Sequence, residues 1–186
     1  MAIVKLQPLK SLIGLLIAAT LLVSCSNKRT IDAHHTIAGM YKLLSIEKLD
    51  PATNNFYEDD FGKGGDSYIL YDASGHMAVH ITSKGYRDFG WLPERQATDE
   101  KALAQHIDSM PLEQLKPALK EFSSSFTYTA NYSINQDSQI ITHSRLSCSV
   151  PSAWGTQVKR HFSFSGDTLI LTFLDGSKRL KWLRQP

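Results

Sequence analysis

The sequence lacks the short motifs that usually reveal a catalytic or metal-binding protein. It has no Gly-x-Ser-x-Gly nucleophile motif, no His-Glu-x-x-His zinc motif, no paired-cysteine spacing and no glycine-rich phosphate loop. His76 and His80 are four residues apart in a predicted strand, which separates them by about 13 Å at ~3.3 Å per residue, too far for two ligands of one zinc ion. We therefore expect no catalytic residue, no metal and no cofactor.

The N-terminus has the pattern of a secretory signal peptide. Lys5 and Lys10 precede an uncharged apolar stretch from Ser11 to Leu22, and a basic segment followed by an apolar run of about 7–15 residues is typical of such signals. A membrane-spanning helix is the alternative, but it needs about 20 apolar residues, and this run is shorter. We expect residues 1–24 to be a signal peptide.

The apolar stretch ends in Leu22-Val23-Ser24-Cys25, which resembles the lipobox of bacterial lipoproteins. The resemblance implies cleavage after Ser24 and lipidation of the Cys25 thiol, so that the protein incorporates palmitate. Residues 25–36 would then be a lipidated tether. We expect a cell-envelope lipoprotein held at a membrane by its N-terminal lipid, with Ser26 favouring the outer membrane over the inner one. The face of the membrane stays open.

The expected mature chain also lacks net charge. The sequence has 20 Lys+Arg and 18 Asp+Glu, and loss of Lys5 and Lys10 with the signal leaves 18 residues of each sign. A balanced chain has no charge excess to attract nucleic acid, so we exclude that partner.

Cysteine is also scarce. Once Cys25 carries lipid, Cys148 has no intramolecular disulfide partner. We expect Cys148 to be a small buried hydrophobic residue, with a reactive or intermolecular thiol as the alternative.

Residues 37–186 form one predicted domain, all-β with a short helical insertion. From Thr98 to Phe122 the apolar residues follow helical spacing, and Pro111 opens a second helix. Residues 50–66 are rich in Asn, Asp, Gly and Pro, which predicts a long loop. The remaining segments alternate polar and apolar residues and suit an eight-stranded antiparallel up-and-down β-barrel, which leaves no exposed edge. The expected strands are Tyr41–Leu49, Ser67–Tyr71, Met77–Ile81, Phe126–Ile134, Gln139–Val150, Gln157–Phe164, Thr168–Phe173 and Lys178–Arg184.

Several short motifs occur in a characteristic order along this domain. They are Gly39-Met40-Tyr41-Lys42-Leu43, then Phe126-Thr127-Tyr128 leading into Ile141-Thr142-His143, then Pro151-Ser152-Ala153-Trp154-Gly155-Thr156, Val158-Lys159-Arg160 and Gly166-Asp167-Thr168-Leu169, and finally Trp182-Leu183-Arg184. Through them the chain resembles the bacterial lipocalin-like domain family over residues 37 to 184. Tyr41 stands where lipocalins commonly have Trp. The resemblance implies a lipocalin-like barrel; many members of the family have no established activity.

The ends of the domain carry the residues expected to close the barrel. The first and last strands of an eight-stranded barrel pair with each other, which would bring Gly39 and Tyr41 next to Trp182 and Arg184. The Arg184 guanidinium would then lie over the Tyr41 ring, an interaction worth about 0.5–2 kcal/mol. We assign these four residues a structural role in barrel closure.

Alternation along the strands predicts which side chains face the interior. Tyr128 and Tyr132 alternate with polar residues on one strand, as do Phe162 and Phe164 on another. Arg160 shares the face of the two phenylalanines. Because a buried guanidinium must be paired, Arg160 either meets an internal carboxylate or binds an anionic ligand. The favoured alternative is a structural pair near the barrel rim or with the loop Pro151–Thr156. We take these five as candidate ligand-binding residues.

An eight-stranded barrel can hold one small ligand between apolar walls. The leading hypothesis is therefore a lipid-anchored envelope protein that binds a small hydrophobic or amphipathic molecule. One alternative is a structural or interaction lipoprotein with a filled barrel and no ligand. The other is a cofactor-free isomerase or cyclase that uses Arg160 and His143, although the strand of His143 lacks clean alternation and leaves the direction of this side chain open.

Overall fold

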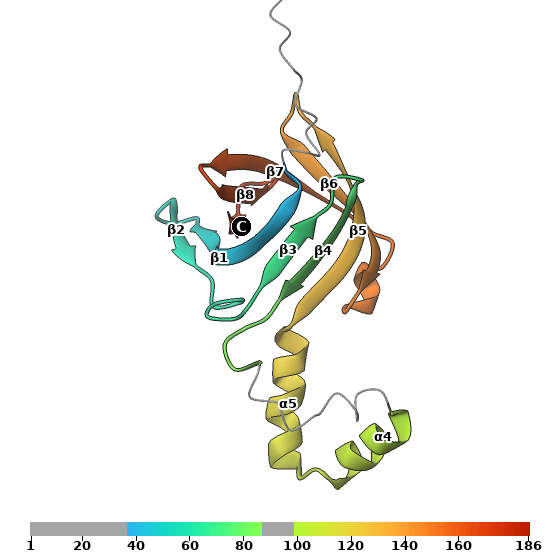
Figure 1. Ribbon diagram of the computed structural model, residues 1–186. Helices are drawn as coiled ribbons and strands as arrows, with labels where there is room; N and C mark the ends of the chain where they lie inside the picture. The colour runs from blue at the N-terminus through green and yellow to red at the C-terminus, as the bar shows by residue number, and fades with distance from the viewer. Residues whose placement is uncertain (1–36, 87–98) are drawn as a thin grey trace, which may run out of the picture. The chain divides into compact units, whose positions relative to one another are not determined.

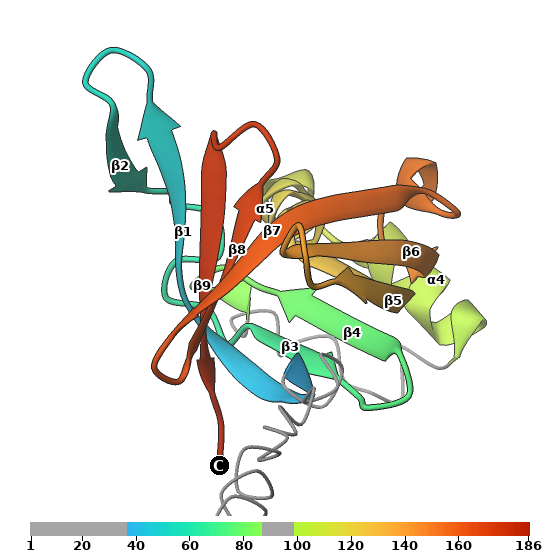
Figure 2. The same ribbon diagram turned by 90° about the horizontal axis from the view of Figure 1, so that it is seen from above.

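The computed structural model describes residues 37–86 and 99–186 and contains a closed antiparallel β-barrel (Figures 1 and 2). The strand order is β2-β1-β3-β4-β5-β6-β7-β8-β9, and β1 also pairs with β9, so that eight strands without β2 form the ring. The predicted signal peptide, Cys25 and the tether lie outside the described residues. The strands are β1 Gly39–Asp50, β2 Asn55–Glu58, β3 Tyr68–Tyr71, β4 His76–Ile81, β5 Phe126–Asn135, β6 Ile140–Cys148, β7 Gln157–Ser165, β8 Thr168–Phe173 and β9 Lys178–Arg184.

The first and last strands close the ring as the sequence predicts. Tyr41 lies opposite Arg184 in the register of β1 and β9, and the guanidinium carbon of Arg184 is 4.7 Å from the centroid of the Tyr41 ring. Arg184 also donates a 2.7 Å hydrogen bond to the carbonyl of Ala38. Gly39 has φ +146°, and a Cβ at this position would be 2.6 Å from Arg184 Nη1, so the close approach of the arginine requires glycine. Trp182 pairs with Leu43 in the same register.

The predicted loop of residues 50–66 is partly wrong, because it contains the strand β2. The Asp50 carboxylate accepts 2.9 Å hydrogen bonds from the Ala52 N–H and the Thr53 hydroxyl, and Asn54 adopts φ +56°. These contacts turn the chain back onto β1, whose last four residues pair with β2. The polar residues thus form a hairpin turn, and the β1–β2 hairpin extends beyond the ring (Figure 2).

Two helices lie between β4 and β5, close to the predicted bounds. Helix α4 (Glu100–Ser109) begins where the Asp99 carboxylate accepts a 3.0 Å hydrogen bond from the Ala102 N–H. Helix α5 (Leu112–Ser124) begins directly after Pro111. Apolar side chains of the pair surround a small pocket, lined by Leu103, Ile107, Met110, Leu115, Ala118, Leu119 and Phe122. No helix within the described ranges is long and apolar enough to span a membrane.

One end of the barrel interior is filled by tyrosines. The Tyr71 ring makes edge-on contacts with Tyr41, at 6.5 Å between centroids, and with Tyr132, at 5.0 Å. The Tyr132 hydroxyl donates to the carbonyl of Asp72, so this buried polar atom is satisfied. Cys148, at the end of β6, is buried with a free thiol. None of these three tyrosines lines the main cavity of the barrel.

Candidate functional site

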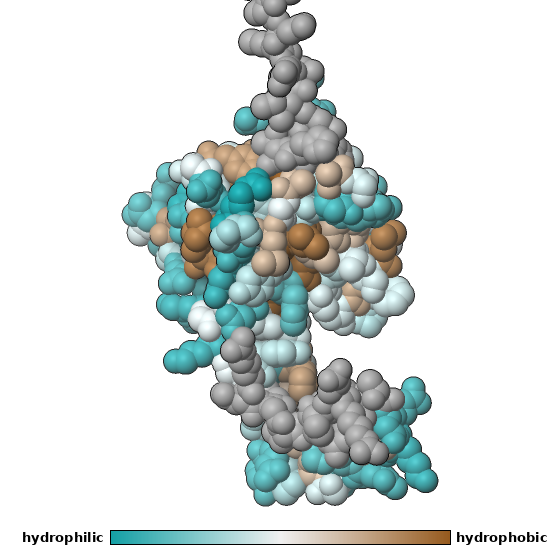
Figure 3. All heavy atoms as spheres, in the orientation of Figure 1, coloured by the Kyte–Doolittle hydropathy of each residue, from teal (hydrophilic) through white to brown (hydrophobic). Residues whose placement is uncertain are grey.

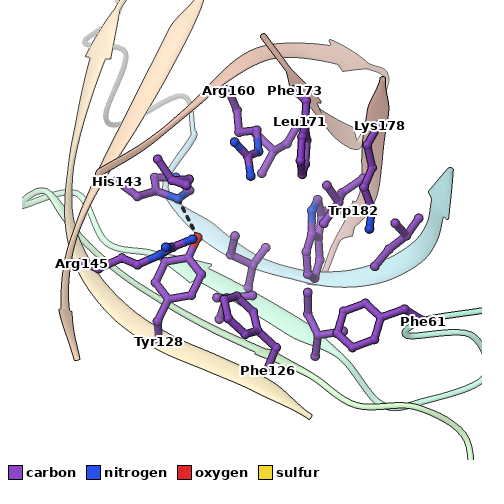
Figure 4. Close-up of a pocket in the computed structure, with 16 residues that line it drawn as sticks. Phe61, Phe126, Tyr128, His143, Arg145, Arg160, Leu171, Phe173, Lys178 and Trp182 are labelled. Atoms are coloured by element: carbon purple, nitrogen blue, oxygen red, sulfur yellow. Dashed lines mark hydrogen bonds between the residues drawn. The ribbon is translucent and has the colours of Figure 1, made fainter. Parts of the chain in front are cut away.

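A cavity of about 230 Å³ lies inside the barrel (Figure 4). All eight barrel strands contribute to its wall, and α4 and α5 contribute none of its lining residues. The wall is mostly apolar, with a few polar side chains. The apolar residues are Ile46, Phe61, Ile69, Val79, Ile81, Phe126, Val158, Leu171, Phe173 and Leu180; the polar ones are Tyr128, His143, Arg145, Arg160, Lys178 and Trp182.

His143 faces inward because β6 contains a bulge. In the register of β5 and β6, Thr129 lies opposite Ser147 but the next residue, Ala130, lies opposite Arg145, so Leu146 has no partner. A bulge of this kind changes which face a strand presents on either side of it. His143 and Arg145 therefore line the cavity, whereas Leu146 is exposed. The direction of His143, which the sequence left open, is settled by this irregularity.

The imidazole of His143 is held between two tyrosines. Its Nε2 is 3.0 Å from the Tyr71 hydroxyl and its Nδ1 is 2.8 Å from the Tyr128 hydroxyl. Burial lowers the pKa of His143 to about 3, with Arg160 and Arg145 contributing in the same direction. A neutral imidazole has one N–H donor and one acceptor nitrogen, so one tyrosine accepts from the ring and the other donates to it.

This network is poorly suited to proton transfer at neutral pH. Burial raises the pKa of Tyr128 to about 12, and His143 ionises only in strong acid. A general acid or base works best when its pKa lies near the working pH. The geometry therefore fixes the Tyr128 hydroxyl at the cavity wall as a neutral polar group, and it does not favour an isomerase or cyclase that uses His143.

Arg160 enters the cavity from β7, as the alternation on that strand predicts. Its guanidinium carbon is 3.6 Å from the centroid of the Phe173 ring, and Nη1 donates a 2.8 Å hydrogen bond to the carbonyl of Lys159. Burial lowers the pKa of Arg160. Among the described residues no carboxylate lies within ion-pair distance of this guanidinium, so the predicted alternative of an internal carboxylate partner is not observed.

Arg145 is a second cavity arginine, which the sequence did not single out. Its guanidinium carbon is 4.9 Å from the centroid of the Tyr128 ring, and Nη1 donates a 3.0 Å hydrogen bond to the Thr156 hydroxyl. The Nε atom is buried and has no hydrogen-bond partner. Like Arg160, Arg145 makes no ion pair with a carboxylate of the described chain.

Lys178, the third cation of the wall, forms an ion pair with a carboxylate. Its Nζ is 3.0 Å from Asp59 Oδ2, which Lys48 also approaches to 3.0 Å. Burial alone would raise the pKa of the Asp59 carboxyl, but the hydrogen bonds from Lys178 and Lys48 outweigh it and lower the pKa. The carboxylate is therefore ionised at neutral pH. Arg145 and Arg160 are the cations of the wall that make no ion pair with a carboxylate of the described residues.

Trp182 adds to the wall an N–H donor that has no acceptor among the described residues. The residue is 1% exposed, and its indole Nε1 has no hydrogen-bond partner. Buried Trp N–H groups usually find one. Trp182 was expected to serve barrel closure, and it does pair with β1, but it also lines the cavity.

The other predicted interior residues lie away from the cavity. Tyr132 is part of the tyrosine-filled end. Phe162 is half-buried against the core. Phe164 shares its face of β7 but is 36% exposed, because it lies one residue from the β7–β8 turn, where the strand has left the packed interior. The expectation that Phe164 lies inside was therefore wrong.

The sequence also missed Phe61, which reaches the cavity from the β2–β3 connection. No local pattern marks Phe61, because its position depends on how a loop crosses the barrel.

In the part of the chain that the structure describes, no group of three His, Cys, Asp or Glu side chains is arranged to hold a metal ion.

The comparison with protein-family models agrees with this architecture. The model of the lipocalin-like domain family matches residues 38–182. Among solved structures, a DUF4847 family protein from Bacteroides vulgatus aligns with a TM-score of 0.40 and 6% sequence identity, covering 80% of this chain and 95% of that one. A search of curated proteins found no significant match. With a family match over most of its length and a closed eight-stranded barrel, the chain belongs to the lipocalin-like domain family.

Proposed function

We propose that the barrel binds a small hydrophobic or amphipathic molecule and that the protein is a lipid-anchored lipoprotein of the cell envelope. The observation that carries the first part is the cavity of about 230 Å³ with a largely apolar wall. Small-molecule sites have this character, apolar surfaces with a few polar groups that orient the ligand. Membership of the lipocalin-like domain family supports ligand binding only by analogy of fold.

The size of the cavity restricts the ligand. A cavity of about 150 Å³ is enough to bind benzene, so the larger space of this barrel suits one aromatic ring system or a short hydrocarbon chain. The wall also differs from an ordinary core, because Arg145, Arg160 and the indole of Trp182 present polar atoms to it. These two features favour a binding protein over a structural barrel with a filled interior.

Cavity binding is tested with two tryptophan substitutions on adjacent residues of β7. Val158 lines the cavity, whereas Lys159 is exposed on the outside of the barrel. Val158→Trp should fill the space and abolish binding of a neutral naphthalene fluorophore, and Lys159→Trp should bind it like the wild type. Both variants should retain the circular dichroism spectrum of the wild type. If the wild type does not bind the fluorophore, or if Val158→Trp binds it equally well, the cavity is not the binding site.

The anchoring proposal is supported by Leu22-Val23-Ser24-Cys25 and by the apolar stretch before it. In cells of an expressing bacterium, Cys25→Ser should eliminate incorporation of labelled palmitate and release the protein from the membrane fraction or leave it unprocessed. Cys148→Ser is the matched control and should remain labelled. Unchanged labelling and fractionation of Cys25→Ser would contradict the lipoprotein assignment. Ser26 supports the outer membrane, which separation of inner and outer membranes tests directly.

A further inference from the structure

Two guanidinium groups enter the same cavity from neighbouring strands. Arg145 belongs to β6 and Arg160 to β7, and Figure 4 shows their side chains on either side of His143, both extending into the space. Both charges act on His143 and on Tyr128. This end of the cavity, formed by Arg145, Arg160, His143 and Tyr128, is called the arginine end below.

The described residues that line the wall include no carboxylate to balance the arginine end. His143 is neutral and Tyr128 is protonated at neutral pH, as shown by their pKa values of about 3 and about 12. A carboxylate whose charge favours the ionised form of Arg160 is Asp175, in the β8–β9 turn. Asp175 is exposed and accepts hydrogen bonds from Ser177, at 3.0 Å from its N–H and 2.7 Å from its hydroxyl. Partly buried guanidinium groups without a counter-ion are unfavourable.

Two donors of the wall are also unused. Arg145 Nε and Trp182 Nε1 are buried and make no hydrogen bond, although buried polar atoms are nearly always hydrogen-bonded in folded proteins. Both residues line the cavity. A group that carries negative charge would offset the charge of the two guanidinium groups, since charge-assisted bonds to guanidinium are among the strongest that proteins make.

We propose that the ligand is a compact amphipathic anion, whose carboxylate-type head group binds at the arginine end and whose short apolar body lies against Phe61, Phe126 and Phe173. This inference rests on the proposed function, because it requires a ligand in the cavity. It goes further by naming the charge of the ligand and the residues that select it. A neutral ligand of the same length fills the apolar part equally well but leaves the arginine end unbalanced.

The test compares three ligands that differ only in the head group: octanoate, 1-octanol and octylammonium. Isothermal titration calorimetry at pH 7.5 should show octanoate binding at least tenfold more tightly than 1-octanol, and octylammonium binding more weakly than both. Arg160→Gln and Arg145→Gln should each weaken octanoate binding by about 10-fold to 100-fold, which is the range expected for one hydrogen bond to a charged group. Neither change should alter the affinity for 1-octanol.

Lys159→Gln is the matched control, because it removes a positive charge from β7 on the outer face of the barrel. It should leave octanoate binding unchanged, which separates a specific contact from a general effect of net charge. Thermal melts without ligand verify that each variant is folded, and the two arginine variants provide independent tests if one of them does not fold.

The outcomes distinguish this inference from the proposed function. If 1-octanol binds as tightly as octanoate, or if both arginine variants keep full affinity for octanoate, the anion is not selected and the inference is wrong, while cavity binding stands. If the neutral naphthalene fluorophore binds and octanoate does not displace it, the inference is also wrong. If neither the fluorophore nor any octyl compound binds, the proposed function fails with it.

Discussion

The buried histidine of the cavity wall predicts how the stability of this protein depends on pH. His143 is 1% exposed and its pKa is lowered to about 3, whereas a histidine in the unfolded chain has a pKa of about 6.5. As the pH falls below 6.5, the unfolded chain therefore gains a proton at this position that the folded protein does not gain. The contribution of the neutral His143 to folding stability is therefore fully present above pH 6.5 and is lost progressively towards pH 3.

The magnitude follows from the separation of the two pKa values. Each pH unit between them lowers the free energy of unfolding by up to about 1.36 kcal/mol. Acidification from pH 7.5 to pH 5 therefore removes about 2 kcal/mol through His143 alone. This range avoids the carboxylates, because Asp and Glu of the unfolded chain have pKa values of about 4 and remain mostly ionised above pH 5.

Urea denaturation at pH 7.5 and pH 5.0, at constant ionic strength, measures this loss. The variant His143→Gln should be less stable than the wild type at pH 7.5, because glutamine does not reproduce both tyrosine contacts, but its loss between the two pH values should be smaller by about 2 kcal/mol. His161→Gln is the control, since His161 is exposed on β7, and it should lose as much stability as the wild type. Equal losses in His143→Gln and the wild type would refute the assignment of a neutral buried imidazole.

Three further predictions concern the barrel itself and are checked by urea denaturation or thiol titration. Gly39→Ala should destabilise the fold by about 1–3 kcal/mol, because alanine is strained at φ +146° and its Cβ would be 2.6 Å from Arg184 Nη1; a loss below 0.5 kcal/mol, roughly the scatter of surface substitutions, would contradict this. Glu47→Gln should cost about 1–3 kcal/mol, because the partly buried carboxylate bonds two cations of β9, and a neutral result would show that this cluster is not stabilising. The Cys148 thiol is 7% exposed and should react with a disulfide reagent slowly in the folded protein and at once in denaturant; rapid reaction of the folded form would show that the site opens readily.

The outline of the barrel could be predicted from the sequence because its signals are local. Turn residues such as Gly75 and Gly166 mark the ends of strands, and alternation on β5 places Tyr128 and Tyr132 inside. The motifs that contain Gly39, Tyr41 and Arg184 resemble those of the family. This resemblance indicated which strands close the ring. In these cases the signal lies in a few consecutive residues, which predict a turn or the face of a strand without knowledge of distant contacts.

The cavity depends on features that no local pattern contains. The bulge at Leu146 exists only relative to the partner strand β5, and it determines that Arg145 faces inward. Phe61 reaches the cavity from a loop, and its place depends on how that loop is held against the barrel. Asp59 pairs with Lys178 across 119 residues of sequence. These contacts between distant segments decide which charges remain in the cavity, and the function depends on those charges.

The contact that closes the ring has a consequence for how the chain folds. Tyr41 and Arg184 are 143 residues apart, and contacts at such separation form slowly because they close a long loop. During synthesis β1 is made first and β9 last, so one edge of β1 stays without its neighbour until nearly the whole domain exists. An open strand edge can pair with another chain and start aggregation. Completion of β9 is thus the step at which an aggregation-prone intermediate becomes a closed ring, and a chain that stops before β9 should accumulate as aggregate.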